Sequence, residues 1–151
     1  ARLRGEDLYT VHPPVAVWYV LVHPDLELST KAIFTSPLLT CNTDPPFAGW
    51  TMSFRKVREA FEKGDFSLAV YNRLEDVAFA MHSELSGIKS KLLSAGCLAA
   101  GMSGSGPTIF GVCRSKEEAQ FVARSFADRR VSIVCPTRVG VNIPDEPANE
   151  I

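Results

Sequence analysis

Residues 99–113 read AAGMSGSGPTIFGVC, and the pattern on either side is arranged around this stretch. Two apolar runs, residues 97–102 and 108–112, flank a segment that contains only small residues. Apolar, β-prone runs that are separated by glycine and proline predict a strand, a tight loop and a second strand. The small residues of the loop, which Pro107 closes, are Ser103, Gly104, Ser105 and Gly106.

The composition of this loop suggests that it is held open for a ligand, with a plain hairpin turn as the alternative. Glycine adopts positive φ and lets another group approach the backbone closely, and serine adds hydroxyl donors. A two-residue hairpin does not need two glycines, two serines and a proline in five positions. No Lys follows the glycines, as a P-loop requires, and Ile109 stands where a dinucleotide fingerprint has its third glycine. We therefore expect Ser103–Gly106 to contact a phosphate or another anion.

Length and composition predict one ordinary domain over residues 1–151. The chain is 46% hydrophobic and 22% charged, with a formal net charge of −1, as in globular proteins. It has no run of basic residues longer than Arg129-Arg130, so we expect no nucleic-acid partner. No apolar run approaches the roughly 18–20 residues of a membrane span, and no signal-peptide pattern opens the sequence. The expected location is the cytoplasm, without membrane association.

The four cysteines do not form a metal-binding or disulfide pattern. Cys41, Cys97, Cys113 and Cys135 are widely spaced, and no Cys or His pair has ligand spacing. Three of the four lie in apolar segments, where reduced cysteine packs as a small hydrophobic residue. We expect neither a metal site nor a disulfide framework.

The first half of the chain predicts a buried strand and a short helix. Residues 15–23 are apolar on both faces, as in a central strand, and Pro24 ends them. Ser29 or Thr30 is a candidate N-cap for a helix that begins at Lys31, and the free N–H groups and hydroxyls there could also face a ligand. Residues 35–49 contain three prolines without periodicity and are expected to form a loop.

Helical periodicity begins after residue 51. Apolar stripes predict helices within residues 54–64, 74–81 and 85–92, all packed on one side of a sheet. Asn72, Glu75 and Asp76 suit the N-terminus of the second of these helices, with Asn72 as its cap. Ser115 and Glu118 have the spacing of a capping box for a further helix, and a final strand is expected from Val131.

These elements together predict an α+β fold of the ferredoxin-like type. The order is βα…ββαβ, which an antiparallel sheet with helices packed on one face satisfies. The Gly-Ser loop then lies at one end of the sheet.

Residues 101–112, GMSGSGPTIFGV, resemble the third, C-terminal glycine-rich motif of the GHMP kinase superfamily. Other segments are most similar to the superfamily's 4-diphosphocytidyl-2-C-methyl-D-erythritol kinases. They are RGE at 4–6, WYVLVHP at 18–24, LSTKAIF at 28–34 and NRLE at 72–75. Leu3 and Arg73 depart from that family, where Gly and an acidic residue are usual.

The resemblance implies that residues 1–151 are a GHMP kinase C-terminal domain. In this superfamily the catalytic aspartate and the long phosphate loop lie in an N-terminal domain, and no such loop occurs in this sequence. The resemblance assigns no catalytic residue and no metal ligand to the chain. It implies binding roles: Ser103, Gly104, Ser105 and Gly106 near the substrate or transferred phosphate, and Ser29 and Thr30 beside the methylerythritol.

The reaction that the resemblance implies is ATP-dependent phosphorylation of the 2-hydroxyl of 4-diphosphocytidyl-2-C-methyl-D-erythritol, in non-mevalonate isoprenoid biosynthesis. ATP and Mg²⁺ are expected to be bound mainly by the N-terminal domain, which is a partner together with the small-molecule substrate. We expect the 151 residues alone to be inactive and to expose an apolar face that allows self-association. Two alternatives remain open: another GHMP kinase, of homoserine or mevalonate type, and a free-standing ferredoxin-like ligand-binding module.

Overall fold

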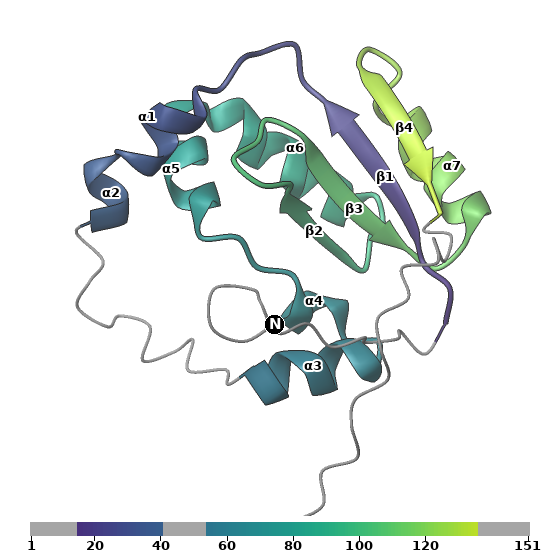
Figure 1. Ribbon diagram of the computed structural model, residues 1–151. Helices are drawn as coiled ribbons and strands as arrows, with labels where there is room; N and C mark the ends of the chain where they lie inside the picture. The colour runs from purple at the N-terminus through teal and green to yellow at the C-terminus, as the bar shows by residue number, and fades with distance from the viewer. Residues whose placement is uncertain (1–14, 41–53, 136–151) are drawn as a thin grey trace, which may run out of the picture.

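The computed structural model describes residues 15–40 and 54–135, and within them one four-stranded antiparallel sheet is formed (Figure 1). The strand order is β2-β3-β1-β4, with β1 paired to both β3 and β4. This order and the antiparallel pairing confirm the ferredoxin-like prediction. The strands are β1 (Trp18–His23), β2 (Ala99–Met102), β3 (Ile109–Cys113) and β4 (Arg130–Val134).

The main core lies between one face of the sheet and three helices. Along β1, Val20 and Val22 point into this core, and Ile109 and Cys113 do so from β3, because alternate residues of a strand share a face. These side chains are covered by residues of three helices: Leu85, Ile88 and Leu92 of α6, Val122 of α7 and Val77 of α5. The helices are α5 (Leu74–Met81), α6 (Ser83–Ser94) and α7 (Lys116–Arg124).

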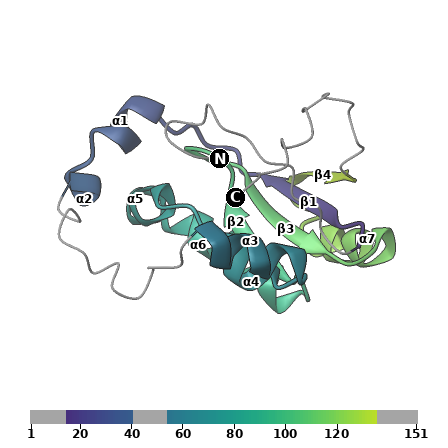
Figure 2. The ribbon, with the colours of Figure 1, turned by 60° about the horizontal axis from the view of Figure 1, so that its bottom comes forward.

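A smaller cluster occupies the opposite face of the sheet. Val17, Ala99 and Val112 alternate with the residues of the main core, and Phe66 packs on them. Two short helices lie side by side here (Figure 2), and their Phe61 and Phe66 rings meet edge to face at 5.5 Å between centroids. They are α3 (Phe54–Glu62) and α4 (Phe66–Ala69). The expectation that residues 54–64 would join the other helices on one side was therefore wrong.

Two short helices were not expected from the sequence. α2 (Pro37–Thr40) falls inside the predicted loop, where Ser36 Oγ accepts a hydrogen bond from Leu38 N. Ser before Pro is a helix-start signal, because proline suits the first helical position. α4 follows Asp65, whose carboxylate accepts a hydrogen bond from Leu68 N at 3.4 Å. Both helices are a single turn, so no periodic stripe announces them.

Other helix ends follow the predicted capping chemistry. α1 (Thr30–Phe34) is capped by Ser29, whose side chain accepts from Ala32 N. Ser115 caps α7 by accepting from Glu118 N at 3.1 Å. In a standard capping box the carboxylate of Glu118 would accept from the N–H of the N-cap residue, Ser115. Here it accepts from the N–H of the preceding residue, Arg114.

The described cysteines are free thiols that pack in or beside the core. Cys97 and Cys113 are buried with their sulfur atoms 3.8 Å apart, and Cys135 is half-buried. The hydrogen bond to Cys113 and burial raise the pKa of the Cys97 thiol. The expectations for Cys41, for residues 4–6 and for the rest of the loop beyond residue 40 lie outside the described residues.

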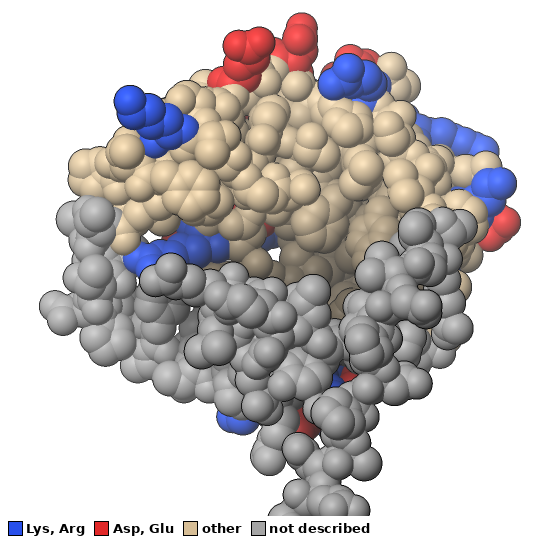
Figure 3. All heavy atoms as spheres, viewed as in Figure 1, with Lys and Arg blue, Asp and Glu red and all other residues tan. Residues whose placement is uncertain are grey.

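Among the described helices, none has the length and apolarity that crossing a membrane would need. In Figure 3, Lys and Arg side chains are scattered over the described part of this face, with acidic side chains beside several of them, and they do not gather into one basic cluster there.

The glycines provide a direct test of core packing. A Cβ at Gly111 would lie 2.5 Å from Cys97 Sγ and 3.1 Å from Leu92 Cδ2, whereas a Cβ at Gly87 meets nothing within 4 Å. We expect Gly111→Ala to destabilise the fold by about 1–3 kcal/mol through overpacking. Gly87→Ala, the control at an exposed position of α6, should stabilise it by about 0.5–1 kcal/mol. Urea unfolding of the two variants measures both effects, and equal stabilities would contradict this packing.

Candidate functional site

The loop between β2 and β3 uses two of its N–H groups internally. Ser103 N donates to Thr108 O and Gly106 N donates to Ser103 O, both at 2.9 Å. Within the described part of the chain, no hydrogen bond engages the N–H groups of Gly104 and Ser105. Those two donors are therefore the backbone groups of the loop that can serve a ligand.

Positive φ shapes the loop at both glycines, with φ of +56° at Gly104 and +83° at Gly106. A Cβ at Gly104 would meet nothing within 4 Å, so this position faces open space. A Cβ at Gly106 would lie 2.7 Å from Met102 Sδ and 2.8 Å from Leu28 Cδ1. Gly106 thus combines positive φ with close packing against the ends of two flexible side chains, whereas Gly104 leaves room beside the two available N–H groups.

The start of α1 meets this loop, although 75 residues separate the two in sequence. Thr30 Oγ1 lies 3.0 Å from Ser105 Oγ, within hydrogen-bond distance. Ser29 stands next to it, with its hydroxyl occupied as the N-cap of α1. The structure therefore brings the two predicted segments, Ser29-Thr30 and Ser103–Gly106, to one end of the sheet, with Thr30 and Ser105 in direct contact.

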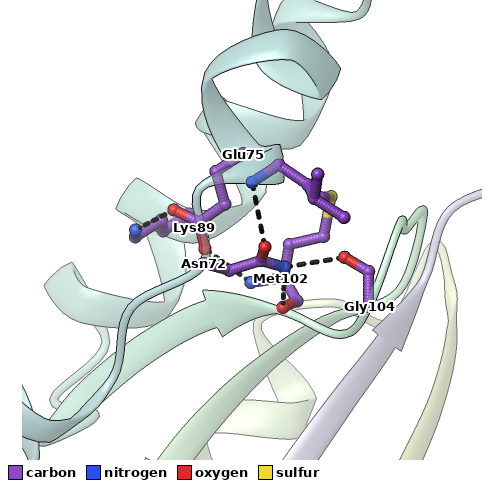
Figure 4. A network of polar contacts seen from close by, with 6 residues as sticks. Asn72, Glu75, Lys89, Met102 and Gly104 are labelled. Carbon is purple, nitrogen blue, oxygen red and sulfur yellow. Dashed lines mark hydrogen bonds and ion pairs between the residues drawn. The ribbon is translucent and has the colours of Figure 1, made fainter. Parts of the chain in front are cut away.

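Asn72 connects the loop to the start of α5 (Figure 4). Its side-chain Nδ2 donates to Met102 O at 2.8 Å and to Gly104 O at 2.7 Å. Its Oδ1 accepts from Leu74 N at 3.0 Å, which is the capping contact expected from the sequence. The amide of Asn72 therefore uses both donors on the loop and its acceptor on α5.

Glu75 is the one charged residue among the described residues that is buried, with 8% of the residue's surface exposed. Its Oε1 accepts from Met102 N at 2.6 Å, and its Oε2 forms an ion pair with Lys89 of α6. A buried carboxylate needs such partners, because an unpaired buried charge is strongly destabilising. The contacts of Glu75 connect α5, α6 and the end of β2.

The sequence did not identify Asn72 and Glu75 as loop contacts. The sequence pattern predicts ordinary residues of a helix N-terminus at both positions, with Glu75 as an acid favoured by the helix dipole. The available signal was the helical spacing, which places Glu75 three residues before buried Ala78 and so turns its side chain toward the core. Which backbone group the carboxylate would meet depends on the neighbouring strand.

His23 of β1 contacts Thr108, the residue that follows the loop and Pro107. Its Nδ1 lies 3.3 Å from Thr108 Oγ1 and its Nε2 lies 3.2 Å from Ser132 Oγ of β4. Thr108 also accepts the hydrogen bond from Ser103 N that closes the loop. The side chains around the loop thus supply hydroxyl, amide and imidazole groups, and the ion pair Glu75–Lys89 lies at the end of β2, where the loop begins.

Comparison with known proteins identifies similar sequences. The family described as "GHMP kinases C terminal" matches residues 54–131, about half of the chain. A 4-diphosphocytidyl-2-C-methyl-D-erythritol kinase of Enterococcus faecalis is 37% identical over 80% of this chain, and one of Bacillus cytotoxicus is 37% identical over 72%. The aligned part of the chain spans only 41% and 36% of the lengths of these relatives.

Solved structures share the fold. A crystal structure of 4-(cytidine 5'-diphospho)-2C-methyl-D-erythritol kinase matches with a TM-score of 0.66 and 25% identity, covering 88% of this chain and 47% of that one. Homoserine kinase from Cytophaga hutchinsonii matches with a TM-score of 0.61 at 19% identity, covering 87% of this chain and 44% of its own. The second similarity, at this identity, concerns the fold alone.

The two loop glycines predict different costs of substitution. We expect Gly106→Ala to destabilise the fold by about 1–3 kcal/mol, because the new Cβ adds overpacking against Met102 and Leu28 to the cost of positive φ. Gly104→Ala should cost only the conformational strain, roughly 1–2 kcal/mol. Thermal unfolding of both variants makes the comparison, and a larger loss for Gly104→Ala would show that the loop packs differently.

Proposed function

Because the chain belongs to the GHMP kinase C-terminal family, we propose that it forms the substrate-binding C-terminal part of an ATP-dependent kinase that phosphorylates a small-molecule alcohol. The substrate is 4-diphosphocytidyl-2-C-methyl-D-erythritol, and the acceptor is its 2-hydroxyl. The substrate assignment rests on relatives of that name at 37% identity. The role of the site rests on one observation: Thr30 meets Ser105 beside the unengaged N–H groups of Gly104 and Ser105.

The proposed role of the loop is electrostatic. The N–H groups of Gly104 and Ser105 donate to oxygens of the transferred phosphoryl group, and the hydroxyls of Ser105 and Thr30 orient the acceptor side. Donors that are fixed before the reaction stabilise charge that develops in the transition state without reorganisation. The bond between the γ-phosphorus and the β,γ-bridging oxygen breaks, and a bond from phosphorus to the substrate oxygen forms as the hydroxyl loses its proton.

ATP supplies the phosphoryl group in this proposal, and Mg²⁺ supplies positive charge to its oxygens. The open space at Gly104 and the two unengaged N–H groups fit a phosphate oxygen. The described residues contain no group of three His, Cys, Asp or Glu side chains that could hold a metal ion. In line with the resemblance to the GHMP kinases, we assign Mg²⁺, the catalytic base and most ATP contacts to an N-terminal domain of the whole protein.

The same proposal gives the partners of the chain. They are the small-molecule substrate and the N-terminal domain. The described surface has exposed apolar side chains, among them Phe34 of α1 and Leu38 of α2. Self-association of the isolated chain stays a prediction, which sedimentation at high concentration can test.

A coupled kinase assay tests the function. The full-length protein with ATP and Mg²⁺ should phosphorylate 4-diphosphocytidyl-2-C-methyl-D-erythritol, and the 151-residue chain alone should stay at background, because positioning of both reactants requires the phosphate loop. Mevalonate and homoserine serve as competing acceptors in the same assay. Faster turnover of either of them would reassign the substrate, and turnover by the isolated chain would refute the division of roles.

A further inference from the structure

We propose that Asn72 is a positioning residue that aims the N–H of Ser105 at the ligand of the Gly-Ser loop. This inference rests on the proposed function for its catalytic consequence, and on the hydrogen bonds of the described residues for its structural part. Asn72 itself does not touch the reacting atoms in this proposal; it acts through the orientation of one peptide group.

The side-chain amide of Asn72 is fully used. One NH₂ group has two hydrogens, and its nitrogen lies 2.8 Å from Met102 O and 2.7 Å from Gly104 O. The oxygen accepts from Leu74 N at 3.0 Å. All three contacts have ordinary hydrogen-bond lengths, and together they leave the amide one orientation.

Holding a carbonyl fixes the N–H on the other side of the same peptide. In a planar trans peptide the C=O and the following N–H point in opposite directions. The carbonyl of Met102 points to Asn72, and accordingly the N–H of Ser103 points away from it and donates to Thr108 O. By the same geometry, the carbonyl of Gly104 points to Asn72, so the N–H of Ser105 points away from α5.

The two peptides differ in what their N–H groups meet. The N–H of Ser103 is used within the hairpin, whereas no hydrogen bond of the described residues engages the N–H of Ser105. Ser105 also places its hydroxyl 3.0 Å from Thr30 Oγ1. The peptide that Asn72 turns therefore presents its free donor at the meeting point of the loop and α1.

Glu75 and Lys89 hold the end of β2 next to Asn72. Glu75 accepts from Met102 N, the residue whose carbonyl Asn72 holds, so β2 ends at two side chains of the same helix start (Figure 4). Lys89 neutralises the buried carboxylate from α6. A movement of α5 relative to the loop would break several of these bonds at once.

The competing explanation is that Asn72 only caps α5. A cap needs an oxygen acceptor for the N–H of Leu74 and makes no use of Nδ2. Asn72→Asp and Asn72→Ser both retain such an acceptor and remove the two donors to the loop. Asp adds a negative charge and Ser adds none, so effects that the two variants share come from the lost donors. Gln120→Glu, on the exposed side of α7, is the control for an amide-to-acid change.

The experiment compares kinetics, stability and amide exchange in the full-length protein. We expect Asn72→Asp and Asn72→Ser to lower kcat by about 10- to 100-fold, since a misplaced donor loses its transition-state contact. KM should change less than kcat, and Gln120→Glu should behave as the wild type. Hydrogen exchange of the Ser103 N–H should accelerate in both Asn72 variants, because the peptide planes are no longer held.

Each outcome decides between positioning and capping. Loss of kcat in both variants at a melting temperature well above the assay temperature supports positioning, whereas activity within twofold of the wild type overturns it. A loss that merely follows the fraction of unfolded protein also overturns it. If the wild type phosphorylates none of the acceptors, the proposed function fails, and the exchange rate of Ser103 alone decides whether Asn72 holds the loop.

Discussion

The buried carboxylate of Glu75 is the interaction on which the arrangement of the site depends. It accepts the N–H of Met102 at 2.6 Å, at the point where β2 ends and the Gly-Ser loop begins, and it pairs with Lys89. A hydrogen bond to a charged group is worth about 1.5–3 kcal/mol, and a buried charge left alone costs more. Because of this, α5, α6 and the start of the loop are held as one unit.

The loop turns two of its carbonyl groups toward the start of α5 and the N–H groups of the same peptides away from it. Carbonyls of Met102 and Gly104 turn toward Asn72, which sends the following N–H groups away from α5. One of them closes the hairpin on Thr108, and His23 supports that side from β1. Among the described residues, the N–H groups of Gly104 and Ser105, beside Thr30, make no hydrogen bond. Such uncharged donors suit phosphate oxygens better than they suit a metal ion.

Core packing explains why the loop can be this irregular. Each strand of the hairpin that carries it contains a glycine that permits close approach. Gly111 of β3 lies against Cys97 and Leu92, and Gly101 of β2 lies near Val70 and Glu75. Close packing on both faces of β3 keeps the strands in register while the loop between them adopts positive φ at Gly104 and Gly106. The packed sheet thus supports a loop whose small residues are exposed or half-buried.

The sequence by itself determined the type of fold, since apolar periodicity is local: residues 15–23, 99–113 and the stripes of α5, α6 and α7 formed the elements that their patterns predict. It also indicated the Gly-Ser loop and a cap at Ser29 or Thr30, of which the structure uses Ser29. Only the tertiary structure decided that α3 and α4 cover the opposite face, that Thr30 meets Ser105, and that Asn72 and Glu75 hold the loop. The hydrogen bonds among these contacts join residues that are 27 to 75 positions apart in the sequence. Such bonds produce no periodic pattern in the sequence, because the partners are backbone atoms or single hydroxyl groups that any sequence contains.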